Sequence, residues 1–225
     1  MRESEVMAGC EAAQECPPAR PDIARRIGAL ERLVDRMVVS AYPKIAPYVD
    51  RIRARHPSAT DLELARMIVR RKSFKNGLVG AVTGIGGFLA MPITVPADVI
   101  GSWRIQITMI LAIARAFRRE TDPEELKTDV LMVLAGDSAK EALKRVGIEV
   151  TRAMTRRAIQ KEISQEVMVK VWAALGRRVA ARVGRKSLVK SQRSAPLIGA
   201  PIGFVFDWFA TQAVGRTAIR YFSED

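Results

Sequence analysis

The amino-acid sequence predicts an all-α protein, a helical bundle around two apolar hairpin segments rich in glycine and proline. Strand-like alternation is rare, and apolar residues recur at spacings of three and four along most of the chain. Residues 76–117 and 195–222 combine low charge with repeated glycines and prolines. Hydrophobic residues make up 48% of the 225 residues, enough for one sizeable core.

We expect residues 1–21 to form a flexible tail and residues 22–225 to form a single helical domain. The tail holds both cysteines, Cys10 and Cys16, and His56 is the only histidine. Such a set supplies neither a disulfide framework nor the ligands of a metal site. The first residues also lack the apolar stretch of a signal peptide. We therefore predict no metal, no cofactor and a cytoplasmic setting.

Two helices are predicted before the first apolar segment. Asp22 can cap the first, and Thr60 or Asp61 can cap the second. We expect the second helix to end in a basic run made of Arg70, Arg71 and Lys72. Basic residues beside an apolar segment are typical of a segment placed at an anionic membrane face. Basic residues are also favourable at any helix C-terminus, so the basic run fits either a membrane contact or an ordinary helix end.

The first apolar segment carries glycines at spacings of three, four and three, namely Gly77, Gly80, Gly84 and Gly87. On a helix this spacing exposes a stripe of backbone that another helix can approach closely. We expect Pro92 and Pro96 to hold a turn, and a second helix to resume near Ala97 with Asp98 as its cap. One arm is short and the other is charged, which favours a buried or shallowly inserted hairpin over a membrane span.

Beyond the first apolar segment, Pro123 marks a helix start, with Thr121 or Asp122 as cap, and Gly136 kinks or ends that helix. A further helix is expected over about 149–175. Residues 152–193 hold twelve Lys or Arg and two Glu, most of the net charge of +13. Within them lies a short basic amphipathic helix, a membrane-surface candidate, with Arg177, Arg178, Arg182, Arg185, Lys186 and Lys190. A solvated helix face is the alternative, and nucleic acid is disfavoured because interleaved aromatic residues are missing.

The second apolar segment mirrors the first, with Pro196, Gly199, Gly203 and one aspartate, Asp207. We predict that the glycine faces of the two segments pack together at the centre of the fold. Asp98 and Asp207 are the only carboxylates in apolar surroundings, and together they could form an acid–base pair with raised pKa values. Helix capping or pairing with arginine is the commoner use of such residues, so we expect no enzymatic activity.

The two segments resemble the EcsC family of bacterial proteins, named for a protein encoded beside an ABC transporter. The resemblance rests on Asn76–Gly87 with Pro92 and Pro96–Asp98, and on Ala195–Ala200 with Gly203, Val214–Arg216 and Arg220–Phe222, over roughly residues 25–222. The family-motif positions are Gly80, Gly84, Gly87, Pro92, Pro96, Asp98, Pro196, Gly199, Gly203 and Asp207. Family members often carry asparagine at the position of Asp207, which argues against a catalytic role. The resemblance implies association with membranes and transport, and no catalytic residue.

Charge and apolar segments together predict a non-enzymatic, peripheral membrane or lipid-binding protein at the inner face of the membrane, and the family resemblance implies an accessory role in transport. The expected contacts with anionic lipid are the basic run Arg70–Lys72 and the six basic residues between Arg177 and Lys190. The alternative is a soluble adaptor that docks on an acidic partner protein and keeps both hairpins as core. Nucleic acid is not expected as a partner, and no small-molecule substrate is indicated.

Overall fold

The computed structural model describes residues 21–85, 91–118, 123–136 and 196–223. These residues are helical apart from short turns, and no strand occurs among them, which confirms the all-α prediction. The expected tail and the basic segment between residues 137 and 195 lie outside the described residues. The elements are α1 (Pro21–Ala41), the 3₁₀ turn η1 (Tyr42–Lys44), α2 (Ile45–Arg55), α3 (Asp61–Ile85), α4 (Met91–Ala116), α5 (Pro123–Ala135) and α9 (Pro196–Ser223).

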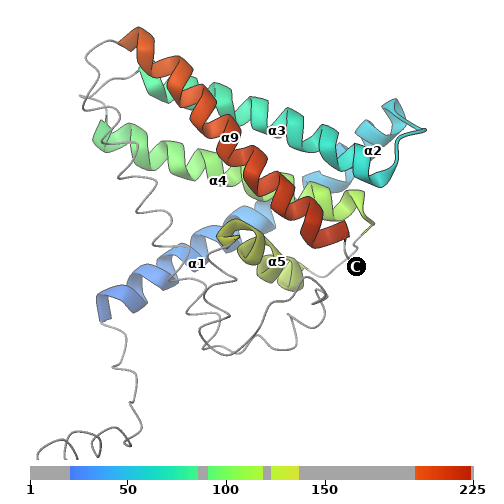
Figure 1. Cartoon of the computed structure of the whole chain (residues 1–225). Helices are drawn as coiled ribbons and strands as arrows, with labels where there is room; N and C mark the ends of the chain where they lie inside the picture. Colours follow the sequence, from blue (N-terminus) through green and yellow to red (C-terminus); the bar gives the residue numbers. More distant parts are fainter. Residues whose placement is uncertain (1–20, 86–90, 119–122, 137–195, 224–225) are drawn as a thin grey trace, which may run out of the picture.

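Three long helices, α3, α4 and α9, form one side of the described molecule, with α1 and α5 against α4 on the other side (Figure 1). Helix α9 runs antiparallel to α3, since Gly80 meets Gly203 while Val69 meets Gly215. Helix α2 lies beside the start of α3 and also contacts α4. Helix α4 therefore touches every other α-helix of the described part.

Local sequence explains three helix ends. The backbone N–H of Thr60 donates to Glu63 Oε2 (2.8 Å), and the N–H of Glu63 donates to Thr60 Oγ1 (3.2 Å), a reciprocal cap that starts α3. Helix α5 begins at Pro123 as predicted. It ends at Ala135 and is followed by Gly136, whose φ of 52° is left-handed and whose N–H donates to the Met132 carbonyl at 2.9 Å.

Two expected helix breaks at the first apolar segment do not occur. Helix α3 continues past the basic run to Ile85, because its glycines pack against α9 and tertiary contact offsets their low helix propensity. Helix α4 begins at Met91 rather than Ala97, so Pro92 and Pro96 lie in its first two turns instead of a separate turn. A proline in the first turn removes only an N–H that has no intrahelical acceptor, so Pro92 costs no helical hydrogen bond. Pro96 lies in the second turn and costs one.

The C-terminal segment is one helix of 28 residues, not a hairpin. Pro196 is its first residue, where proline is well tolerated, and Pro201 lies inside the helix near the same end. Its missing N–H leaves one backbone carbonyl of that first stretch without its usual helical donor. The prediction of a second hairpin over residues 195–222 is therefore wrong, whereas the prediction of helical structure there is confirmed.

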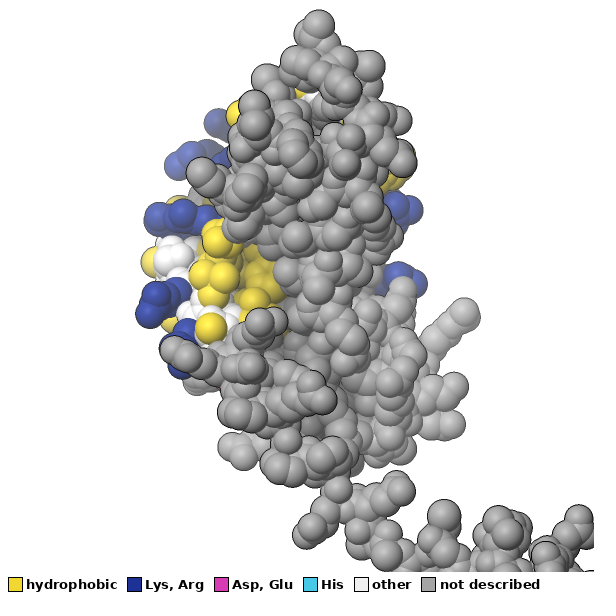
Figure 2. Space-filling view, turned by 90° about the vertical axis from the view of Figure 1, so that its left-hand side faces the viewer, with side chains coloured by type: hydrophobic (Ala, Val, Ile, Leu, Met, Phe, Trp, Pro, Cys, Tyr) yellow, Lys and Arg dark blue, Asp and Glu magenta, His cyan; other side chains and the backbone are white. Residues whose placement is uncertain are grey.

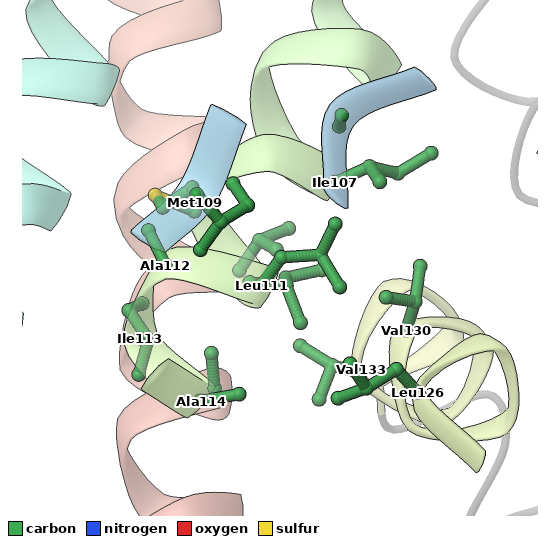
Figure 3. Packing of buried hydrophobic residues seen from close by; sticks show 14 of the residues in the cluster. Ile107, Met109, Leu111, Ala112, Ile113, Ala114, Leu126, Val130 and Val133 are labelled. Atoms are coloured by element: carbon green, nitrogen blue, oxygen red, sulfur yellow. The ribbon is translucent and has the colours of Figure 1, made fainter. Parts of the chain in front are cut away.

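Helix α4 is the centre of the core. From Ile105 to Ala116 it is buried on all sides, except for the half-buried Thr108 and Arg115. Figure 3 shows Leu111 on α4 directed toward Val130 and Val133 of α5. One continuous cluster of buried apolar side chains joins α4 to α1, α2, α3, α5 and α9. None of the described helices combines the length and apolar character that crossing a membrane requires.

Candidate functional site on the α3 and α9 helix pair

Glycines bring the backbones of α3 and α9 into direct contact. A Cβ placed on Gly80 would overlap the Gly203 carbonyl and Oδ2 of Asp207, and a Cβ on Gly203 would overlap the Gly80 carbonyl. At Gly77 an added Cβ would lie 2.8 Å from the Phe204 ring. The two glycine faces thus meet as the spacing predicted, and only glycine fits at Gly80 and Gly203.

Buried polar side chains lie next to the glycine contact. Asn76 Nδ2 on α3 donates to Ser102 Oγ on α4 (2.9 Å) and to Thr211 Oγ1 on α9 (2.7 Å). Gln106 Nε2 reaches the same two hydroxyls at 3.4 Å. All four side chains are at most 2% exposed, and the neighbouring Asp207 is fully buried. Buried hydrogen bonds between three helices hold those helices in one register, because a shift would leave polar groups without partners.

Two atoms of this layer have no partner in the described part of the chain, Ser73 Oγ and Asn76 Oδ1. Each buried polar group of this kind costs about 1–3 kcal/mol. The buried polar layer therefore fixes the relative register of the three helices more than it adds to the stability of the fold. The predicted site residues did not include Ser102, Gln106 or Thr211, and Asn76 was named only as part of the family motif. Ser102 and Gln106 stand four apart, a spacing that places both side chains on one helix face.

The described residues contain no group of three or more His, Cys, Asp or Glu side chains that could hold a metal ion. Asp98 is the eighth residue of α4, so it does not cap that helix as expected. Its side chain is not among those described, and its pairing with Asp207 stays a prediction.

The three residues of the basic run face different surroundings, because successive helix residues differ in direction by about 100°. Arg70 and Arg71 are exposed. The Lys72 ammonium instead lies 4.5 Å from the centroid of the Tyr48 ring on α2. Burial, with a smaller contribution from Lys75, lowers the pKa of Lys72 to about 8. Lys72 is half-buried, so Arg70 and Arg71 are the more exposed residues of the run, and the contact of all three with an anionic surface stays a prediction.

A pocket of about 910 Å³ lies between α3 and α9 and extends to the end of α5. Four exposed arginines line it, Arg66 and Arg70 from α3 and Arg216 and Arg220 from α9. Within the described ranges no carboxylate forms an ion pair with any of them. Apart from Arg70, these arginines were not among the predicted contacts, although each pair shows the spacing of four that places two side chains on one helix face.

Large apolar side chains are exposed on the same two helices. Phe74, Leu78 and Val82 recur every four residues on α3 and are 55%, 48% and 69% exposed. Val205 and Phe209 on α9 are 49% and 55% exposed. The rings of Phe74 and Phe204 meet edge to face at 5.7 Å, which connects the two helices on this side. An apolar surface of this kind is a common mark of a membrane or partner contact.

The exposed large apolar residues and the four pocket arginines occupy different halves of the helix pair. Because Gly80 meets Gly203 and Val69 meets Gly215, the exposed apolar residues share the half that holds the end of α3 and the start of α9. The four arginines share the other half, roughly ten residues or about 15 Å away along the axis. On the described part of the face in Figure 2, hydrophobic side chains lie between Lys and Arg side chains, and no Asp or Glu is visible there.

For several predicted site residues, the side chains are not among those that the structure describes. Gly87 and all six basic residues between Arg177 and Lys190 lie outside the described residues. The helix backbones locate a second group of these residues: Gly84 in α3, Pro92 and Pro96 in α4, and Pro196 and Gly199 in α9.

Fold and surface define an all-helical protein with a glycine-mediated helix pair that displays apolar and basic residues. The chain belongs to the EcsC protein family, whose match covers residues 60–224. The match starts at the cap of α3 rather than near residue 25, so α1 and α2 lie before it. Searches of curated proteins and of solved structures gave no match.

Proposed function

We propose that this protein is a non-enzymatic, peripheral membrane protein that binds anionic lipid surfaces through the α3 and α9 helix pair. The observation that carries the proposal is the exposure of five large apolar side chains on helices that also carry four arginines without a described ion-pair partner. A membrane interface satisfies both features, because it offers hydrocarbon beside anionic head groups. The cytoplasmic face of the membrane and an accessory role in transport belong to the same proposal and rest on the family resemblance.

The expected energies favour a reversible attachment. Burying the exposed half of a phenylalanine side chain contributes about 1–2 kcal/mol, at about 25 cal/mol per Å². Each arginine close to an anionic surface contributes about 1 kcal/mol, and salt weakens this part. Neither contribution is sufficient alone, so binding is expected to need both the apolar residues and anionic lipid.

A soluble adaptor with both apolar segments wholly buried as core is the competing function. The exposure of Phe74, Leu78 and Val82 supports the membrane proposal over that alternative, because these residues belong to the first apolar segment and do not join the core. An acidic partner protein is nevertheless an outcome that the test below can reveal.

Flotation of the full-length protein with liposomes tests the proposal. Vesicles of phosphatidylcholine alone are compared with vesicles containing phosphatidylglycerol, at low and high salt. We expect binding to the anionic vesicles, weakened at high salt, and a loss of about tenfold or more in the double variant Phe74→Ser with Leu78→Ser. Val39→Ser on α1, which also replaces an exposed apolar residue, should bind like the parent.

Absence of binding to either vesicle would overturn the proposal and lead to a search for an acidic protein partner. Equal loss in the Val39→Ser variant would show that the effect is not specific to the α3 and α9 pair. Melting temperatures accompany each variant, and exposed positions should change them little.

A further inference from the structure

We propose that the pocket lined by Arg66, Arg70, Arg216 and Arg220 binds the phosphate group of an individual anionic lipid. This inference deepens the proposed function by naming the headgroup chemistry. The choice of a lipid rests on the proposed function, whereas the phosphate site rests on the pocket alone. The arginine pocket, as we call it, is open to solvent and is distinct from the buried polar layer around Asn76.

Helix geometry brings the four guanidinium groups to one place. Arg66 and Arg70 stand one turn apart on α3, as do Arg216 and Arg220 on α9, and all four line the same pocket. Gly215 permits this arrangement, because an added Cβ there would lie 2.6 Å from Val69 Cγ1. The close approach of the helices at this point keeps the two pairs of arginines near one another.

The charge of the pocket is largely uncompensated in the described structure: Glu63 interacts electrostatically with Arg66, and no described carboxylate forms an ion pair with any of the four arginines. No Asp or Glu is among its lining residues. Glu63, one turn before Arg66, accepts hydrogen bonds from the backbone and hydroxyl of Thr60 at 2.8 and 2.9 Å. Arginine stays charged at any physiological pH and forms paired hydrogen bonds with phosphate oxygens. A bound phosphate would therefore relieve repulsion between four neighbouring cations.

The other lining residues favour a phosphate that carries an organic group over the free ion. The volume of about 910 Å³ is at the upper end of the range for small-molecule sites and far exceeds one phosphate. Trp208, Ile219 and Val133 supply an apolar part of the wall, while Gln212 and Thr217 supply neutral polar groups. The exposed apolar residues of the helix pair begin with Phe74, about 6 Å along α3 from Arg70, within reach of acyl chains attached to the same lipid.

Calorimetric titration of the full-length protein with soluble probes tests the site without a membrane. The probes are dihexanoyl phosphatidic acid below its micelle concentration, dihexanoyl phosphatidylcholine, and inorganic phosphate. We expect one molecule of the phosphatidic acid to bind per chain, at least tenfold more tightly than either other probe. It should also change the tryptophan fluorescence, and the change should be lost in Trp208→Phe.

The test variant is Arg70→Gln with Arg216→Gln, and the matched control is Arg36→Gln with Arg51→Gln, exposed positions on α1 and α2 outside the pocket. Both remove the same charge. We expect the dissociation constant to rise at least tenfold in the first variant and less than twofold in the control, with little change in melting temperature for either.

Equal weakening in both double variants would overturn the site, because it would show a diffuse effect of net charge. No binding of any probe would do the same. Inorganic phosphate binding as tightly as the lipid would overturn the lipid assignment, and displacement of the lipid by a short single-stranded oligonucleotide at equal concentration would point to nucleic acid instead. Vesicle flotation that fails while the soluble lipid still binds would remove the proposed membrane attachment but leave the site.

Discussion

Helices α5 and α9 both complete the core around α4, yet they are held by different kinds of contact. Helix α5 presents Leu126, Val130 and Val133 to aliphatic side chains of α4 (Figure 3). Helix α9 meets α3 backbone to backbone at Gly80 and Gly203, beside buried polar side chains. Aliphatic packing tolerates exchange of one apolar side chain for another, whereas glycine contacts and buried hydrogen bonds permit a single register. The first contact supplies stability, and the second fixes the position of the proposed lipid-binding surface.

The largest expected effect is at the glycine contact. Gly80→Leu or Gly203→Leu should abolish the cooperative thermal unfolding transition measured by circular dichroism, because either side chain would overlap the backbone of the facing helix. Gly101→Ala is the control, since its added Cβ would meet only Val79 Cγ1 at 3.9 Å, and it should stabilise the protein by about 0.5–1 kcal/mol. Melting temperatures equal to the parent in the leucine variants would disprove the contact.

A smaller loss is expected on the aliphatic side. Leu111→Ala removes a side chain that is 2% exposed, and it should lower the free energy of unfolding by about 3 kcal/mol. Leu111→Met keeps the volume and should cost less than about 1.5 kcal/mol. Urea denaturation measures both. If the free energy of unfolding fell as much in the methionine variant as in the alanine variant, the contact between α4 and α5 would tolerate side-chain exchange as poorly as the glycine contact does.

Removal of Asn76 should cost less than removal of Leu111. Asn76→Ala deletes the donor shared by Ser102 and Thr211, and we expect a loss of about 2 kcal/mol in urea denaturation. Thr108→Ala serves as the control, since its hydroxyl bonds only the Arg104 carbonyl of its own helix, and it should change stability by less than about 0.5 kcal/mol. Similar values for the two variants would show that the polar layer does not hold the three helices together.

A pH dependence of stability is expected at Lys72. Burial lowers its pKa to about 8 in the folded protein, against about 10.4 in an unfolded chain. Between these values the unfolded chain binds more protons, so stability should rise with pH from about 8 to 10, while below pH 8 the burial penalty is present in full. The Lys72→Met variant should show a smaller rise in stability with pH, and it should be more stable than the parent at pH 7. Urea denaturation at several pH values measures both effects.

Lys44→Met removes an exposed lysine and provides the control for Lys72. Its stability should follow the parent at every pH. A Lys72→Met variant that is less stable than the parent at pH 7 would show that attraction between the ammonium and the Tyr48 ring outweighs the cost of burial.

Much of the helical framework follows from the sequence alone. Thr60, Pro123 and Gly136 mark helix ends by local chemistry, through a side-chain cap, a fixed φ and a left-handed φ. The spacing of Gly80 in one segment and Gly203 in the other also predicted a close helix contact. These signals are readable because each depends on residues a few positions apart or on a repeated helical spacing.

Only the tertiary structure decided where the helices run without a break and which side chains meet. Helix α3 passes through its basic run because α9 covers its glycines, a contact between residues far apart in sequence. Asn76 and Thr211 are 135 residues apart, and their hydrogen bond exists only once two helices share one register. The arginine pocket arises in the same way, from two short basic pairs that are unremarkable until antiparallel packing brings them together. Local propensity determines a helix, but register and facing residues follow from long-range packing that a single sequence does not display.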